Sequence, residues 1–206
     1  MHPTAPHFSP AAERNRAPIL QVLQGLLPAQ GRALEIASGS GQQAAFFAAA
    51  LPGWQWHPTD VGDAAFASIA AWCQDSGASN VAPAMVLDVA AQPWQSPATN
   101  AGPFDLIYCA NLLHIAPWAC CAGLMAGAAQ HLTQRGLLVT YGPYLEADVP
   151  TAPSNAAFDA QLRASDPQWG LRALADVQAQ AAKAGLHLQA RHTMPANNLL
   201  LVWGRP

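Results

Sequence analysis

The chain has 206 residues, of which 51% are hydrophobic and only 10% are charged, and its formal net charge is −3. This length and apolar fraction suffice for one domain with a substantial core. The lack of a basic excess argues against binding to a nucleic-acid backbone, and without a run of about 18 apolar residues no segment is expected to span a membrane.

Four cysteines are present, and none of them forms a C-x-x-C pair. This pattern is typical of a reduced chain rather than of a disulfide framework or a zinc site. Residues 1–18 lack the apolar core of a signal peptide. We therefore expect a cytoplasmic protein without a bound metal, and the sequence leaves the oligomeric state open.

Helical and strand patterns alternate along the first two thirds of the chain. After a loose tail over residues 1–10, apolar periodicity predicts a helix over 11–27. Alternation of strands and helices predicts a mostly parallel sheet covered by helices on both faces. The further predicted elements are strand 32–37, helix 42–51, strand 54–58, helix 63–75, strand 84–87, strand 104–110, helix 117–132 and strand 136–141.

The last third of the chain departs from this alternation. Residues 145–167 are polar and irregular, and we expect a lid-like insertion there. A long helix is predicted over 168–184, and strands 186–194 and 199–203 are joined by a connection too short for a crossover helix, which indicates an antiparallel pair. Residues 1–206 are thus expected to form one α/β, Rossmann-like domain. Its seven-stranded sheet with a C-terminal antiparallel hairpin resembles the layout of class I methyltransferases.

A glycine-rich turn follows the first predicted strand, where residues 34–41 read Leu-Glu-Ile-Ala-Ser-Gly-Ser-Gly. Glycines let a ligand approach the backbone, and the next helix points its positive end there. Residues 39–44 also fit the dinucleotide pattern G-x-G-x-x-G/A, so two cofactors compete for one motif. Glu35, four residues before Gly39, is awkward beside a pyrophosphate but suits the ammonium and sulfonium of S-adenosylmethionine.

Acidic residues close the next two predicted strands. Asp60 can accept hydrogen bonds from ribose hydroxyls in either type of cofactor site, and Asp88 can hold an adenine amino group. Such acids also serve as helix caps, but together with the glycines they indicate a ligand crevice at the carboxyl ends of the strands. The candidate cofactor-binding residues are Glu35, Ala37, Gly39, Ser40, Gly41, Gln42, Asp60, Asp88, Val89 and Asn111.

The ends of the fourth and fifth strands supply the candidate catalytic residues His114, Asn111 and Tyr144. Asn111 can offer an oxygen near the methyl group, and Tyr144 lies on the same rim. His114 is the best candidate for a general base because its ordinary pKa is near 6.5. Packed aromatic residues and structural histidines also occur at such positions, so this assignment is a hypothesis.

Several stretches resemble the family that includes methyltransferase-like protein 26, a family of unknown function. The resemblance covers nearly the whole chain and implies a class I methyltransferase fold and S-adenosylmethionine binding, without implying a substrate. One departure is Gln43, where the family usually has histidine, although glutamine can still position a group by hydrogen bonds. The stretches are 13–16, 18–20, 34–42, 56, 58–60, 110–118, 141–143, 154–159, 166–170 and 194–199.

Polar loop residues within and beside these stretches are candidates for substrate binding, although serine and asparagine also serve turns and caps. The candidates are Arg14, Asn15, Arg16, Trp118, Ser154, Asn155 and Asn198.

The function that these observations favour is S-adenosylmethionine-dependent methyl transfer to a small-molecule acceptor. Two alternatives stay open. A nicotinamide-dependent oxidoreductase is disfavoured by Glu35, Asp88 and the terminal hairpin. A protein that binds S-adenosylmethionine or S-adenosylhomocysteine without turnover would show the same motifs.

Overall fold

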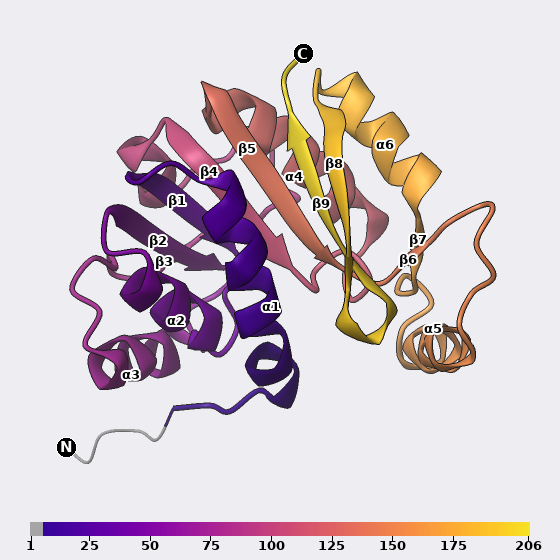
Figure 1. Ribbon diagram of the computed structural model, residues 1–206, viewed down its shortest axis with the longest axis horizontal. Coiled ribbons are helices and arrows are strands. Elements are labelled where there is room, and N and C mark those ends of the chain that lie inside the picture. The colour runs from indigo at the N-terminus through magenta and orange to yellow at the C-terminus, as the bar shows by residue number, and fades with distance from the viewer. Residues whose placement is uncertain (1–5) are drawn as a thin grey trace.

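The computed structural model describes residues 6–206, in which one twisted sheet runs through the centre of the molecule (Figure 1). The strand order is β3-β2-β1-β4-β5-β9-β8. The first five strands in this order pair in parallel, whereas β9 is antiparallel to both of its neighbours. The strands are β1 (Gly31–Ile36), β2 (Trp54–Asp60), β3 (Met85–Val86), β4 (Phe104–Ala110), β5 (Leu132–Gly142), β8 (His187–Met194) and β9 (Asn198–Gly204).

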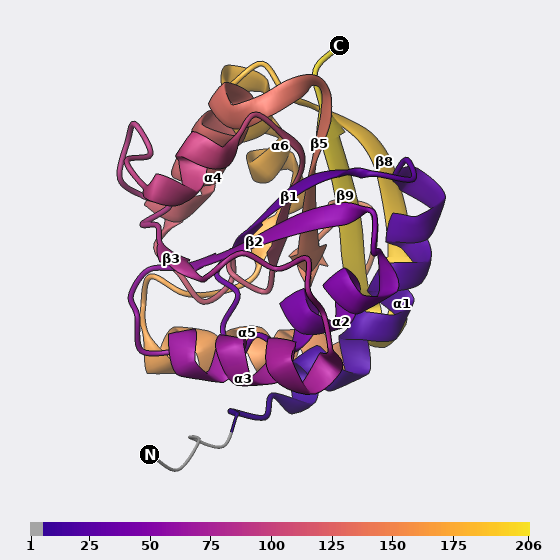
Figure 2. The ribbon, with the colours of Figure 1, turned by 90° about the vertical axis from the view of Figure 1, so that its left-hand side faces the viewer.

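Helices cover both faces of this sheet, and Figure 2 shows the two layers from the side. One face carries α1 and α2, with α3 beside α2, and the other carries α4 and α6. The helices are α1 (Pro10–Leu26), α2 (Gln42–Ala50), α3 (Phe66–Ser76), α4 (Trp118–His131), α5 (Pro153–Ser165) and α6 (Leu174–Lys183), with short 3-10 turns η1 (Pro97–Ala101) and η2 (Pro195–Asn197).

The core is divided by the sheet into two apolar layers, because successive strand residues point to opposite faces. In β9, Leu200 and Val202 pack in the layer with α1 and α2, whereas Leu201 and Trp203 pack in the layer with α4 and α6. Strands buried on both faces must be apolar nearly throughout, and the residues of β4 and β9 are nearly all apolar. The predicted fold, a seven-stranded Rossmann-like sheet with a C-terminal antiparallel hairpin, is confirmed.

The helix predicted over 168–184 is shorter than expected. Only Leu174–Lys183 is helical, and β7 (Arg172–Ala173) pairs in parallel with β6 (Tyr144–Leu145). The guanidinium of Arg172 donates to the carbonyl oxygens of Leu113 and Ala116, at 2.8 and 2.7 Å. These contacts to the loop after β4 hold the chain extended here, which sequence periodicity does not predict.

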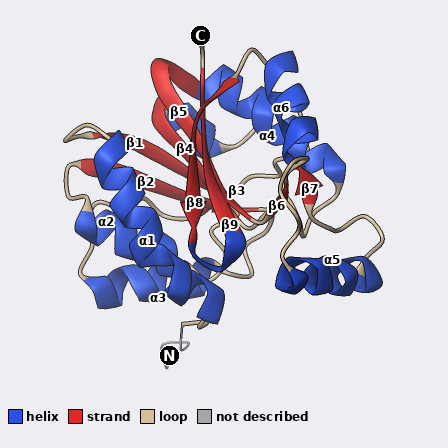
Figure 3. Ribbon diagram, turned by 45° about the vertical axis from the view of Figure 1, so that its right-hand side comes forward, coloured by secondary structure: helices blue, strands red, loops and turns tan. Residues whose placement is uncertain are grey.

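The insertion over 145–167 is not irregular throughout, because it contains the 13-residue helix α5. Pro153 occupies the first position of this helix, where its missing N–H costs nothing. An ion pair between Asp159 and Arg163, one turn apart, supports it at 2.8 Å. Figure 3 shows α5 set apart from the sheet, on the side of β6 and β7.

The described part of the predicted loose tail is anchored. The backbone N–H of His7 donates to Ser68 at 2.8 Å, and the indole of Trp72 donates to the carbonyl of His7 at 2.9 Å. Ser9 caps the first turn of α1. Residues 1–5 of the predicted tail lie outside the described residues. From residue 6 onward, no helix is both long and apolar enough to cross a membrane.

Candidate functional site

A cavity of about 710 Å³ opens at the carboxyl ends of β1, β2 and β4. Its floor is the turn after β1 together with the end of β2, and its walls come from the start of α1, the loop after β4, α5 and the tip of the β8–β9 hairpin. Figure 3 shows α1, α5 and the hairpin between β8 and β9 reaching the lower side of the molecule. Ligands bind at this edge in open α/β sheets.

The turn after β1 is the most strongly curved part of the floor. Ala37, Gly39 and Gly41 have φ angles of 55°, 54° and 87°. A Cβ atom added to Gly39 would meet no atom within 4 Å, so this glycine exposes backbone to the cavity. A Cβ atom on Gly41 would lie 2.5 Å from the Cα atom of Ile69, so Gly41 instead permits α2 and α3 to pack closely.

Asp60 lies at the end of β2, on the rim of this floor. One carboxylate oxygen accepts from the backbone N–H of Gly39 at 2.9 Å, and the other accepts from that of Val61 at 2.8 Å. These bonds fix the orientation of the carboxylate. Each oxygen retains a further lone pair, so Asp60 can accept two additional hydrogen bonds from a ligand.

Glu35 lies beneath the turn and does not line the cavity, contrary to the expectation that its carboxylate faces a ligand. Its side chain points to the α1 and α2 face of the sheet, as Ala33 and Tyr108 do, and only 2% of it is exposed. The indole N–H of Trp56 donates to its carboxylate at 2.5 Å. Burial raises the pKa of Glu35 to about 8, the Trp56 hydrogen bond opposes this, and the charge of Asp60 adds to it.

Asn111 and His114 form the wall beyond β4. Asn111 has a φ of 58°, and its backbone N–H donates to the carbonyl of Tyr141 at 2.8 Å. Both side chains lie against Gly142, where an added Cβ would be 3.3 Å from Nδ1 of His114 and 3.8 Å from Oδ1 of Asn111. The imidazole stands edge-on to Phe158 of α5, with ring centroids 5.5 Å apart.

The electrostatic setting of His114 keeps its ring neutral. Burial and the nearby cation Arg172 lower the pKa of His114 to about 4. At neutral pH this imidazole can accept a hydrogen bond but carries no charge. It is therefore a weaker base than the sequence suggests, because the positive form is disfavoured on both counts.

Three predicted catalytic or substrate residues do not reach the cavity. Tyr144 is buried, and its hydroxyl donates to a threonine of β5 at 3.0 Å. Arg16 pairs with Glu13, and its guanidinium lies over an aromatic ring of α2. Trp118 is covered by the guanidinium of Arg172, whose carbon lies 5.6 Å from the ring centroid. All three side chains are occupied by packing contacts.

Three predicted cofactor residues also lie elsewhere. Asp88 is exposed on the loop after β3, and its carboxylate accepts from the backbone N–H of Ala90 at 2.9 Å. Val89 is buried in the core, and Gln42 is buried with its amide donating to Glu13 at 3.3 Å. Asp88 follows the two-residue strand β3 and lines a different pocket rather than this cavity.

Other predicted residues do come together around the cavity. Two further residues, Gln43 and Phe158, line the cavity with them. The sequence alone does not predict these two, although Gln43 departs from the family pattern. Only 6% of Gln43 is exposed, and its Oε1 accepts from the hydroxyl of Tyr108 at 2.9 Å. The predicted residues that line the cavity are Arg14, Asn15, Ala37, Gly39, Ser40, Asp60, Asn111, His114, Ser154, Asn155 and Asn198.

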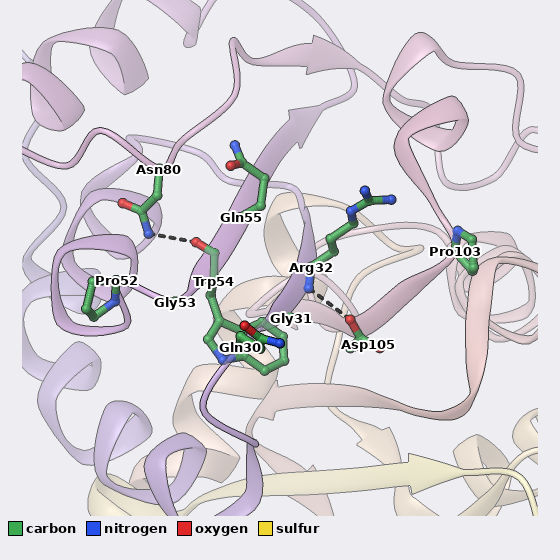
Figure 4. A pocket seen from close by; sticks show the side chains of 10 residues that line it. All are labelled: Gln30, Gly31, Arg32, Pro52, Gly53, Trp54, Gln55, Asn80, Pro103 and Asp105. Atoms are coloured by element: carbon green, nitrogen blue, oxygen red, sulfur yellow. Dashed lines mark hydrogen bonds between the residues drawn. The ribbon is translucent and has the colours of Figure 1, made fainter.

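A second pocket, of about 510 Å³, lies at the opposite edge of the sheet, by the amino ends of β1, β2 and β4 (Figure 4). Several of its polar groups are used internally. The amide of Asn80 donates to the carbonyl of Trp54 at 2.7 Å, and the backbone N–H of Arg32 donates to Asp105 at 3.0 Å. We therefore take the cavity at the carboxyl edge as the candidate site. Across residues 6–206 no cluster of three or more histidine, cysteine or acidic side chains is arranged to hold a metal ion.

The family profile described as "Protein of unknown function (DUF938)" matches residues 6–205, so it includes the glycine turn, the loop after β4 and the hairpin tip. The chain belongs to this family. The match agrees with the resemblance to a family of unknown function, whereas the link to methyltransferase-like protein 26 stays a prediction. The floor and walls described above thus belong to one DUF938 unit.

The fold of this DUF938 protein is similar to that of several solved methyltransferases. Mitomycin 7-O-methyltransferase MmcR matches 95% of the chain with a TM-score of 0.78 and 15% identity. CalO1, a methyltransferase in calicheamicin biosynthesis, matches 95% with a TM-score of 0.74 and 14% identity. An O-methyltransferase family 2 protein from Planctomyces limnophilus matches 91% with a TM-score of 0.73 and 20% identity.

The DUF938 protein spans little more than half the length of these structures. The match covers 54% of MmcR, 54% of CalO1 and 61% of the Planctomyces limnophilus protein. At these identities the likeness establishes the methyltransferase-like fold, and the cofactor and substrates of the larger proteins are not carried over with it.

Proposed function

We propose that this DUF938 protein binds S-adenosylmethionine and transfers its methyl group to a small-molecule acceptor. The observation that carries the proposal is the pairing of Asp60 with the exposed backbone of Gly39 on the floor of the cavity. This pairing places a fixed carboxylate beside a glycine turn, within a fold that solved methyltransferases share.

The residues on the floor fit the cofactor. Asp60 offers free lone pairs to two ribose hydroxyls, and the open space above Gly39 admits a ligand against the backbone. Ser40 and Asn111 add polar groups to the same surface. Asp88 gives no support for an adenine contact, because it does not line the cavity.

The cofactor, when bound, supplies a methyl group that is already activated for displacement. The chain's own residues then have to align the acceptor, which contributes up to about 7–11 kcal/mol in well-oriented reactions. His114, neutral and next to Asn111, accepts a hydrogen bond from an acceptor hydroxyl or amine. With a pKa near 4 it orients the acceptor more effectively than it removes a proton.

The size of the cavity supports a small acceptor. A volume of about 710 Å³ has to hold both cofactor and acceptor, and sites for small molecules are typically about 300–1,000 Å³. Phe158 and Ile115 give the acceptor side an apolar wall. Two of the similar structures were solved with apigenin and with 2-hydroxy-5-methyl naphthoic acid, which are small aromatic molecules of this kind.

Calorimetry with S-adenosylhomocysteine and with NAD tests the cofactor. We expect S-adenosylhomocysteine to bind and NAD not to bind. Asp60→Ala should weaken binding by about 1.5–3 kcal/mol, the value of hydrogen bonds to a charged group. Asp63→Ala, an exposed residue of the same loop outside the cavity lining, is the matched control. Equal affinity of Asp60→Ala and wild type would refute the ribose assignment.

Turnover is tested separately from binding. Incubating the protein with S-adenosylmethionine and a metabolite extract should release S-adenosylhomocysteine, and the methyl label should appear in the small-molecule fraction. Binding without any release would favour a protein that holds the cofactor but does not transfer the methyl group. Label found in RNA or protein instead would contradict a small acceptor.

A further inference from the structure

We propose that one end of the cavity binds a carboxylate group between the side chains of Arg14 and Gln43. The proposal rests on the proposed function, because the carboxylate belongs either to the methionyl part of the cofactor or to the methyl acceptor. Both residues line the cavity, Arg14 from the first turns of α1 and Gln43 from the first turn of α2.

Gln43 presents a buried donor without a partner. Its Oε1 accepts from the hydroxyl of Tyr108, which is fully buried and fixes the amide in place. Its Nε2 is shielded from water and has no hydrogen-bond partner within residues 6–206. An unsatisfied buried N–H is costly, so a side chain held in this way at a cavity indicates that a ligand acceptor completes it.

Arg14 presents an unpaired positive charge to the same cavity. It is exposed and makes neither a hydrogen bond nor an ion pair in the part of the chain that the structure describes. Its neighbour Glu13 is already engaged by Arg16 and Gln42 and so does not neutralise it. The side chains of Arg14 and Arg16 point in different directions. Arg16 packs against α2, whereas Arg14 faces the cavity.

Tyr141 supplies a second buried donor without a partner within residues 6–206. The hydroxyl of Tyr141 is buried without a partner among the described residues. Burial raises the pKa of Tyr141 to about 12, and the charge of Arg14 acts against that rise. Tyr141 is not part of the cavity lining, so the proposal rests on Arg14 and Gln43.

The combination selects a carboxylate by its chemistry. A guanidinium and an amide N–H₂ supply only donors, and the positive end of α2 adds to the attraction for an anion. A carboxylate has two oxygens and about four lone pairs, and arginine binds it with two parallel hydrogen bonds. The other charged group on the lining, Asp60, is held in place by the backbone N–H groups of Gly39 and Val61.

The first experimental arm measures the cofactor. Calorimetric affinities of S-adenosylhomocysteine and 5′-methylthioadenosine are compared, since only the former carries a carboxylate. Arg14→Gln removes the charge, and Gln43→Glu keeps the acceptor for Tyr108 but replaces the orphan donor by a negative oxygen. If the site takes the methionyl carboxylate, both variants weaken S-adenosylhomocysteine at least tenfold and leave methylthioadenosine within twofold. Arg16→Gln, which lies off the cavity, is the control.

The second arm measures the acceptor. The protein saturated with S-adenosylhomocysteine is titrated with 1-naphthoate and with 1-naphthamide, which differ only in the carboxylate. If the site takes an acceptor carboxylate, wild type prefers the acid, and both variants lose that preference. The proposal is overturned if both variants keep the wild-type difference between S-adenosylhomocysteine and methylthioadenosine and also that between naphthoate and naphthamide. If wild type binds neither S-adenosylhomocysteine nor methylthioadenosine, the proposed function is refuted. The comparison of naphthoate with naphthamide on the free protein would then still test the carboxylate site.

Discussion

Replacing Glu35 by glutamine tests how the buried carboxyl group beneath the glycine turn affects stability. Its pKa is about 8 in the folded protein against an ordinary value of 4.5, chiefly because burial disfavours the charged form. The folded-state pKa is raised, so the stabilising effect of the bound proton is complete below pH 4.5. That effect is lost as the pH rises towards 8, because the unfolded chain gives up the proton while the folded protein retains it.

The size of the effect follows from the two pKa values. Each pH unit between them lowers the free energy of unfolding by 1.36 kcal/mol, so the full loss from pH 4.5 to 8 is about 5 kcal/mol. Glutamine cannot ionise, and its amide oxygen can still accept the hydrogen bond of Trp56. The Glu35→Gln variant should therefore be within about 1 kcal/mol of wild type near pH 5 and exceed it by several kcal/mol near pH 8.

Urea unfolding between pH 5 and 9 measures the difference between the two proteins. Taking the difference removes the contributions of all other titrating groups. An exposed acid, Asp75→Asn, is the control and should leave the difference near zero at every pH. Wild-type and Glu35→Gln curves that stay parallel over this pH range would show that the carboxyl is not held in its neutral form.

Two further predictions concern the glycine turn and the histidine. Gly41→Ala should lower the free energy of unfolding by about 2 kcal/mol or more, because its Cβ would lie 2.5 Å from the backbone of Ile69 at a φ of 87°. Gly39→Ala, with a φ of 54° but open space around its Cβ, should lower the free energy of unfolding by less. Thermal melts of the two variants measure both changes. Once an acceptor is known, His114→Ala should lower turnover about a hundredfold, because the acceptor loses its orientation, with S-adenosylhomocysteine affinity unchanged. Because the pKa of His114 is about 4, the wild-type rate should show no histidine titration between pH 5.5 and 8, and a limb near 6.5 that vanishes in His114→Ala would contradict this.

The sequence by itself determined the architecture, because the architecture depends on local patterns. Near-continuous apolar runs such as β4 predicted strands buried on both faces, and the short link after Met194 predicted the antiparallel hairpin. The curvature at Gly39 and the acid at the end of β2 are likewise properties of short segments. These features placed the cavity floor correctly without any knowledge of long-range contacts.

The tertiary structure alone decided which side chains face the cavity and in what electrostatic setting. Glu35 is buried in the layer with α1 and α2, where the indole of Trp56 from β2 holds its carboxyl group, and Asp88 lines a different pocket. The low pKa of His114 comes first from burial and then from the charge of Arg172, which is 58 positions further along the chain. Tyr108 of β4 occupies the amide oxygen of Gln43 in α2, which leaves the amide N–H₂ group as the part without a partner among the described residues. Burial and charge are set by residues distant in sequence, so no local pattern encodes them.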